Sequence, residues 1–234
     1  MKKVMWIISF IALAGTAIVL QFMPDSVPMH YDLEGNIDRW GSKYENLIFP
    51  VIILAVSLLC TLLINYYKKK AGKTADEKES AGARSNAKVI SIVGIAMAVM
   101  YTVMQGVILY GSYTEAVSRA ERQAVDIGKV SAILMGILFI VLGNFMTKTR
   151  INSTVGVRIS WSMYNDNTWR KSNRFGAFAI MVAGVLTIIT AVLLKNSFAV
   201  AMIGLGYILL ASVITVIYAR KAYKDEIESE RGNS

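Results

Sequence analysis

Long apolar stretches without one charged residue constrain this chain more than any other feature. Each has 18 to 26 residues, and at about 1.5 Å per helical residue that length crosses, or nearly crosses, a hydrocarbon layer of ~30 Å. All 25 basic and 16 acidic residues lie between or beyond the stretches, whereas a soluble protein carries charge on the outer faces of its helices. The sequence therefore predicts an all-α, polytopic membrane bundle of six transmembrane helices. The stretches are 4–23, 47–67, 89–114, 130–147, 175–194 and 196–219.

The basic residues are unevenly distributed over the connecting segments, and this bias predicts an orientation. With a cytoplasmic N-terminus, 19 Lys and Arg residues face the cytoplasm and 6 face the outside, as the positive-inside rule requires. An even number of spans returns the C-terminus to the cytoplasm, so the chain is expected to be a multi-pass cell-membrane protein with both termini inside. Topology and attraction to anionic membrane lipids explain the basic inner face. The basic loop lacks a nucleic-acid recognition pattern, so no direct nucleic-acid partner is expected.

Two connecting segments stand out by composition. The segment 24–46 follows the first span, and its Glu34-Gly35-Asn36 turn signal lies between two short runs of alternating polarity. This pattern predicts a small extracellular hairpin or ordered loop. The segment 68–88 consists mainly of charged and small residues, which predicts a flexible basic cytoplasmic linker because such a composition buries little apolar surface.

The linker divides the predicted spans into two groups. A two-helix membrane unit occupies 1–67 and a four-helix membrane unit occupies 89–219, followed by a cytoplasmic tail over 220–234. In the second unit, residues 115–126 are expected to form a short polar helical connection outside, and the loop 148–174 is expected to face the cytoplasm. No internal repeat is evident, so an inverted-repeat transporter is not supported.

The residues usually needed for catalysis or ion coupling are scarce. No Asp, Glu, Lys, Arg or His lies within the spans, although ion-coupled pumps usually carry one at membrane depth. His30 is the single histidine and lies outside the membrane, while Cys60 lies inside it. Neither a His-based metal cluster nor a Cys-His pair is therefore expected. The sequence predicts no catalytic, cofactor or metal site and a protein that is not an enzyme.

A run of oxygen donors in the outer segment resembles the first half of a calcium loop. Gly35 stands two positions too early for the glycine of such a loop, and Lys43 stands where its bidentate Glu should be. A solvated turn is therefore the favoured interpretation. The donors are Asp32, Glu34, Asn36 and Asp38.

The inner loop 148–174 is rich in aromatic and basic residues. Trp161, Tyr164 and Trp169 have amphipathic rings that suit the headgroup layer, so an interfacial anchor explains much of the loop. The pattern Gly156-x-Arg158-x-x-Trp161 goes further, because a glycine for a tight bend beside a planar guanidinium favours an ordered, folded-back loop. Such a loop could grip a partner or a lipid phosphate.

Two motifs resemble those of a known family. The outer pattern Pro24-Asp-x-x-Pro28-x-His30, with Gly35 and Trp40-Gly-Ser-Lys43 behind it, is similar to the N-terminal membrane domain of unknown function found in SdpI-like proteins. The inner pattern is similar to the second motif of that family, and together they cover about residues 20 to 178 in the expected order. The resemblance implies binding or structural roles for Pro28, His30, Gly35, Trp40 and Lys43 outside, and for Asn144, Asn152, Gly156, Arg158, Trp161, Trp169 and Arg174 inside.

The resemblance also implies a function. The namesake of the family is a bacterial immunity protein that protects a producing cell from its own secreted killing peptide and holds a cytoplasmic repressor at the membrane. By this resemblance, the partners of the chain are membrane lipids, a secreted peptide toxin and a cytoplasmic transcriptional repressor. The inner motif departs from the usual pattern at Ile151, Ser160 and Asn173, where proline, proline and histidine are common.

The leading hypothesis is therefore a membrane immunity or sensor protein that acts without catalysis. Two alternatives from other classes stay open: a membrane enzyme or lipid-handling protein, and a passive transport component. A carboxylate, histidine or lysine at membrane depth would favour either alternative, and the spans contain none.

Overall fold

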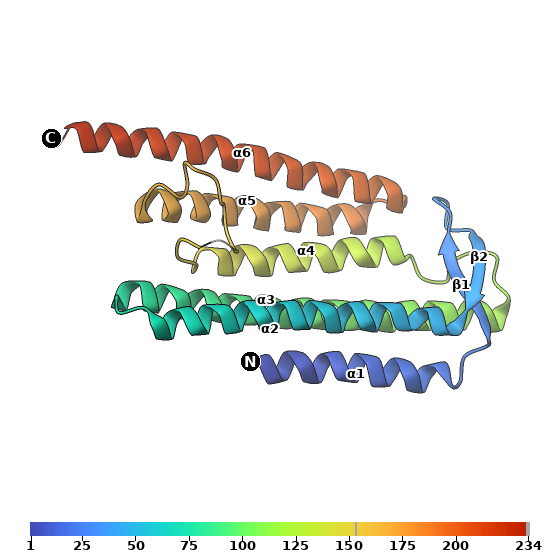
Figure 1. Ribbon diagram of the computed structural model, residues 1–234. Coiled ribbons are helices and arrows are strands. Elements are labelled where there is room, and N and C mark those ends of the chain that lie inside the picture. The colour runs from blue at the N-terminus through green and yellow to red at the C-terminus, as the bar shows by residue number, and fades with distance from the viewer. Residues whose placement is uncertain (153, 233–234) are drawn as a thin grey trace.

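The structure, a computed structural model, describes residues 1–152 and 154–232. It consists of α-helices lying side by side in an elongated bundle, with a β-hairpin at one end (Figure 1). In this described part, six helices are long and apolar enough to cross a membrane, so the all-α prediction is confirmed. The elements are α1 (Lys2–Leu20), β1 (Ser26–Tyr31), β2 (Ile37–Ser42), η1 (Lys43–Leu47), α2 (Ile48–Lys73), α3 (Glu77–Ser118), α4 (Ile127–Met146), α5 (Asp166–Leu193) and α6 (Ser197–Gly232).

The connections gather at the two ends of the bundle. The hairpin end carries β1, β2 and the turns 119–126 and 194–196. The motif-loop end carries the start of α1, the turn 74–76, the loop 147–165 and the end of α6 (Figure 1). The segments predicted to share one side of the membrane therefore share one end of the bundle.

The predicted flexible linker 68–88 is instead helical. Helix α2 continues to Lys73 and α3 begins at Glu77, so only 74–76 separates them. The Asp76 side chain caps α3 by accepting a hydrogen bond from Lys78 N at 2.8 Å. The linker prediction was wrong because Ala, Lys and Glu form helices well and small side chains allow α2 and α3 to pack closely. Ala71 and Ala83 are both buried there.

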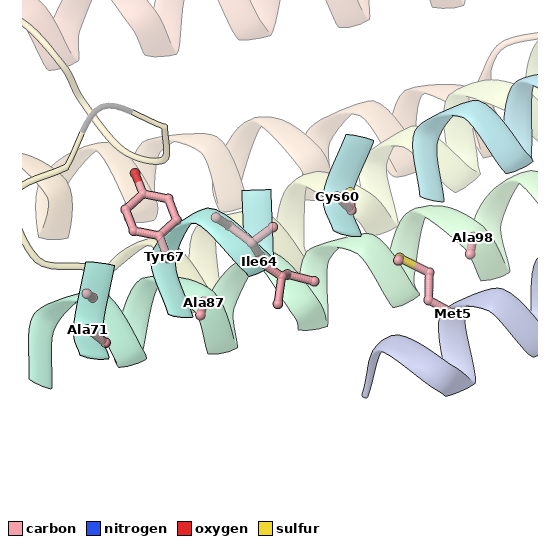
Figure 2. Packing of buried hydrophobic residues seen from close by; sticks show 9 residues of the cluster. Met5, Cys60, Ile64, Tyr67, Ala71, Ala87 and Ala98 are labelled. Carbon is pink, nitrogen blue, oxygen red and sulfur yellow. The ribbon is translucent and has the colours of Figure 1, made fainter. Parts of the chain in front are cut away.

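The grouping of two plus four spans is also wrong, because the helices pack as three plus three. The tight turn makes α2 and α3 antiparallel neighbours, and α1 packs against both. Figure 2 shows their shared core, which includes Met5 of α1, Cys60 and Ile64 of α2, and Ala87 and Ala98 of α3. Tyr67, also in this core, points its hydroxyl toward the loop 147–165.

The other three helices form a second layer built on α5. Helix α5 lies between α4 and α6, and α4 also contacts α3. Gly136 and Gly184 bring α4 and α5 into backbone contact, since a Cβ on Gly136 would lie 2.7 Å from the carbonyl oxygen of Gly184. Small residues allow such close approach between membrane helices.

Two further boundaries differ from expectation. Helix α3 continues through Ser118 and ends at Arg119, whose φ of 50° is left-handed, so 115–126 is only partly helical. The predicted tail 220–234 is a continuation of α6 as far as Gly232, and residues 233–234 lie outside the described part. Both helices are longer than the apolar runs because good helix formers continue past the last apolar residue.

Candidate functional site

The hairpin is built around a tight turn between β1 and β2. Asp32 makes the turn, because its carboxylate accepts hydrogen bonds from the backbone N–H groups of Glu34 and Asn36, both at 2.8 Å. The same carboxylate accepts from the Asn36 side chain at 2.8 Å, and these bonds lower the pKa of Asp32. Gly35 adopts a φ of 81°, which favours glycine. Asp32 is therefore a structural residue of the turn.

The hairpin is joined to the segment after α3. Ile37 N donates to the Glu121 carbonyl at 2.8 Å, and Gln123 N donates to the Gly35 carbonyl at 2.9 Å. Asn36 and Arg122 form a β-bridge. These contacts hold the hairpin tip against the turn 119–126.

A buried carboxylate anchors the base of the hairpin. Glu115 is 0% exposed, and its two oxygens accept hydrogen bonds from the Tyr31 hydroxyl and from Ala124 N, each at 2.6 Å. Burial and the neighbouring Glu115 carboxylate both raise the pKa of Tyr31. Tyr31 therefore stays a hydrogen-bond donor, and one side chain of α3 holds both the hairpin and the turn 119–126.

An open groove of about 440 Å³ lies between β1 and the adjoining ends of α2 and α3. Its walls are mainly apolar, and polar groups from Gln105 and Ser112 converge on it. The Arg39 guanidinium, paired with Glu45 at 3.0 Å, lies at its polar rim. The apolar lining residues are Pro28, Met29, Ile48, Phe49, Ile108 and Ile127.

Gln105, one of the lining residues, has a buried amide oxygen without a hydrogen-bond partner in the described part of the chain. Its side chain is 2% exposed, and its Nε2 donates to Thr16 Oγ1 at 3.2 Å and to the Asn46 carbonyl at 3.1 Å. These two acceptors fix the orientation of the amide, because a flipped amide would place oxygen against the Asn46 carbonyl. Among the described residues, no donor reaches Gln105 Oε1. A buried acceptor without a partner is costly, so this amide oxygen is an exception to the rule that buried polar groups form hydrogen bonds.

The outer motif residues separate into groove and scaffold positions. Pro28 and His30 line the groove, and His30 Nδ1 lies 2.6 Å from Asp38 Oδ1. Trp40 pairs with Pro28 across the hairpin and is 42% exposed. Gly35 forms the turn, and Lys43 ties the hairpin base to the end of α1, with its Nζ 3.0 Å from Asp25 Oδ1 and 3.1 Å from the Met23 carbonyl.

The acidic residues of the hairpin are mostly engaged within it. Asp38 meets His30, Glu45 caps the following turn, and Asp32 holds the tip. In the described residues, no group of three or more His, Cys, Asp or Glu side chains could hold a metal ion. In the calcium-loop pattern, Asp32 stabilises the turn through hydrogen bonds to backbone N–H groups.

At the other end of the bundle, Asn152 organises the inner motif. Its Nδ2 donates to the carbonyls of Arg150 at 2.6 Å and Val155 at 2.9 Å, and its Oδ1 accepts from Thr154 N and Val155 N, both at 2.7 Å. Tyr67 of α2 reaches this turn, with its hydroxyl 2.7 Å from Thr154 Oγ1. The amide therefore folds the loop and docks it on α2.

Asn173 and Gly156 fix the second bend of the loop. Asn173 Oδ1 accepts from Val157 N at 2.8 Å, and its Nδ2 donates to the Trp169 carbonyl at 3.0 Å. Gly156 has a φ of 119°, and a Cβ there would lie 3.0 Å from the Trp169 ring and clash with the Asn173 amide. Trp169 is buried, and its indole N–H donates to the Thr149 carbonyl at 3.0 Å. The predicted folded-back loop is thus present.

The remaining inner motif residues lie at the surface. Arg158 and Arg174 are exposed, and Asn144 is exposed near the end of α4. Trp161 is half-buried beneath Arg220 of α6, whose Cζ lies 5.5 Å from the ring centroid. The structure therefore gathers Asn152, Gly156 and Trp169 into the loop interior and leaves the arginines outside it.

The extension of α6 covers the start of α5. Glu226 accepts hydrogen bonds from the side chains of Asn165 at 3.0 Å and Asn167 at 2.5 Å, and Lys171 approaches it at 3.4 Å. The Asn165 bond and its neighbours lower the pKa of Glu226. The cytoplasmic tail predicted from the sequence is thus part of the ordered motif-loop end.

Three functional candidates were not singled out from the sequence. Gln105 lies within the apolar run 89–114, and an amide at that position was the available signal. Glu115 was placed in a polar connection, so nothing suggested its pairing with Tyr31, which lies 84 positions away. Asn173 was noted only as a departure from the usual inner motif, although an amide can bond two backbone groups at once.

Comparisons with known proteins agree with these two motif regions. Residues 7–54 match the domain of unknown function DUF1648, and residues 148–219 match the SdpI/YfhL protein family. Immunity protein SdpI of Bacillus subtilis strain 168 is 23% identical over 210 residues, which cover 89% of this chain and 89% of that protein. No solved structure gives a significant match. The resemblance of both motifs is confirmed.

Proposed function

We propose, from the premise that the chain is an SdpI-like membrane protein, that it protects a bacterium against a secreted membrane-active peptide without catalysis. The observation that carries this proposal is the groove beside the hairpin, with mainly apolar walls and the polar side chains of Gln105 and Ser112 in its lining. A peptide in the membrane interface presents both apolar side chains and polar backbone groups, so it matches the mixed lining of the groove. Exposed charges of the hairpin would aid encounter more than affinity, because salt screens them within ~8 Å.

Filling the groove tests this proposal directly. Ile108→Trp places a bulky ring in the groove and leaves the Gln105 hydrogen bonds intact, so we expect it to abolish tolerance. The matched control is Val103→Trp on the same helix, where the side chain is 48% exposed. The measurement is the killing concentration of a panel of secreted peptides, including any encoded beside the gene, in sensitive cells that express each variant at equal membrane abundance. Full protection by Ile108→Trp would exclude the groove.

The same proposal assigns the motif-loop end to a cytoplasmic repressor. The loop contacts α3, where Asn86 Oδ1 accepts from Arg150 N at 3.2 Å, and it contacts α6 through Tyr164 and Glu230 at 2.8 Å. A shift of either helix would therefore alter the exposed loop surface. The same sensitive cells can also express a fluorescently tagged regulator encoded beside the gene. This regulator should move from the cytoplasm to the membrane when the cognate peptide is added. A regulator that stays in the cytoplasm would restrict the function to immunity.

The proposal requires the hairpin to be extracellular and both termini to be cytoplasmic. In a Cys60→Ser background, a cysteine in place of His30 should react with an impermeant maleimide in intact cells. A cysteine in place of exposed Ser160, at the other end, should react only after permeabilisation. The reverse labelling pattern would overturn the orientation and with it the outer site. Lipid-handling, enzymatic and passive-transport functions are the competing proposals, and each predicts protection that does not discriminate between peptides.

A further inference from the structure

A basic groove lies at the motif-loop end, on the side of the bundle formed by α1, α2 and α3. Helix α1 begins short of the turn 74–76, so α2 and α3 continue past its first residues (Figure 1). The step leaves a hollow of about 440 Å³ with a floor that includes Ala87 and Ser91, both buried. The cations that line it are Lys2, Lys3, Lys68, Arg84 and Lys88.

No acidic side chain lines this basic groove, so its charge is uncompensated. Within the described residues, none of its five cations forms an ion pair with a carboxylate. The neighbouring pocket near the turn 74–76 differs, because Lys70 pairs there with Glu79 at 3.0 Å and Lys78 pairs with Asp166 at 2.5 Å. Like charges that converge without a counter-ion repel one another, and a bound anion relieves that repulsion.

The helices α1, α2 and α3 bring the cations together. Lys2 Nζ donates to Asn65 Oδ1 at 2.6 Å, which ties the start of α1 to α2. Arg84 and Lys88 are four residues apart on α3 and therefore lie on one face of that helix. Arginine can bind a phosphate with two parallel hydrogen bonds, and lysine adds a point charge.

The groove lies next to exposed apolar residues of α1. Val4 and Ile7 of α1, a few residues past the lysines, are 47% and 57% exposed, so this side of the helix presents apolar side chains. A ligand that fits must combine an anionic head with an apolar body. We propose that the basic groove binds the phosphate of an anionic phospholipid headgroup, with the acyl chains lying along α1.

The test uses the full-length protein in detergent and native mass spectrometry, with dioleoyl phosphatidylglycerol and dioleoyl phosphatidylcholine as probes. We expect the wild-type protein to prefer phosphatidylglycerol by about tenfold or more, given that each basic residue near an anionic surface contributes appreciably. Equal binding of the two lipids would overturn the proposal without any variant. Displacement of phosphatidylglycerol by millimolar inorganic phosphate would assign the groove to free phosphate and would also overturn it.

Neutral substitutions of the basic residues then test whether the preference for phosphatidylglycerol arises in the basic groove. Lys68→Gln, Arg84→Gln and Lys88→Gln together should abolish it, with helicity by circular dichroism unchanged. The matched control removes three charges elsewhere at the same end, through Arg170→Gln, Lys221→Gln and Lys224→Gln at exposed positions, and should keep the preference. An equal loss in the control would show a diffuse surface effect and overturn the site.

Discussion

Alanine in place of Gly156 should abolish accumulation of the folded protein. The φ of 119° is unfavourable for a residue with a Cβ, which costs about 1–3 kcal/mol. The new Cβ would also meet the Asn173 amide and the Trp169 ring, and displacing such packed groups costs roughly 1–3 kcal/mol more. These effects act on the bend that joins the loop to α5. The measurement is the monodisperse yield in mild detergent and the unfolding temperature of whatever protein remains.

A second glycine at the same end provides the control for that experiment. Gly72 lies near the end of α2, and a Cβ there would meet nothing within 4 Å. Gly72→Ala should therefore keep full yield, with a small gain in stability because alanine is the better helix former. Equal yield and unfolding temperature of the two variants would show that the bend at Gly156 tolerates a side chain. The fold of the loop would then not depend on glycine at this position.

Replacing Glu115 by alanine should release the hairpin from the helix bundle. The change leaves the Ala124 N–H and the half-buried Tyr31 hydroxyl without their acceptor, at about 0.5–1.5 kcal/mol for each lost hydrogen bond. The hairpin and the turn 119–126 should therefore become sensitive to added protease in the purified protein, while α1–α6 stay helical. Limited proteolysis followed by mass mapping of the first cut measures this directly.

Two further substitutions grade the effect of the Glu115 change. Glu115→Gln keeps one acceptor oxygen and turns the other into a donor, so it should give an intermediate rate of cleavage. Glu121→Ala removes an exposed carboxylate in the same connection and leaves the Glu121 carbonyl to accept from Ile37 N, so it should match wild type. Resistance of Glu115→Ala at the wild-type level would mean that the backbone bonds to the hairpin tip suffice.

The membrane spans could be predicted because charge exclusion is a local property of the sequence. The hairpin could be predicted for the same reason, because Pro24 and the Glu34-Gly35-Asn36 turn are local signals that end the first span and separate two short strands. The prediction of a flexible linker at 68–88 was wrong because it neglected packing. A charged, alanine-rich segment is disordered only if nothing packs against it. Here Ser80 Oγ donates to the Ala71 carbonyl at 2.7 Å, and the two helices support each other.

The candidate site was less accessible to sequence reasoning, because its key contacts join distant positions. The Gln105 amide reaches Thr16 across 89 positions, and the loop residue Thr154 meets Tyr67 across 87 positions. A residue whose partner lies far away in the sequence therefore gives no sign of its contact when the sequence alone is considered. The inner motif was found because Gly156 and Trp169 act within one local fold, whereas the groove has no contiguous signature.

Helix α3 is the longest helix in the described part of the chain, and it runs without a break between the two ends of the molecule. Its 42 residues correspond to about 63 Å at 1.5 Å per residue. At one end it holds the hairpin through Glu115, and at the other Ser85 Oγ donates to the Lys148 carbonyl at 2.8 Å. An α-helix is stiff along its axis, so the two ends of α3 keep a nearly constant separation. The hairpin and the loop 147–165 are thus attached to one continuous helix, so an axial displacement of α3 would move both attachment points together.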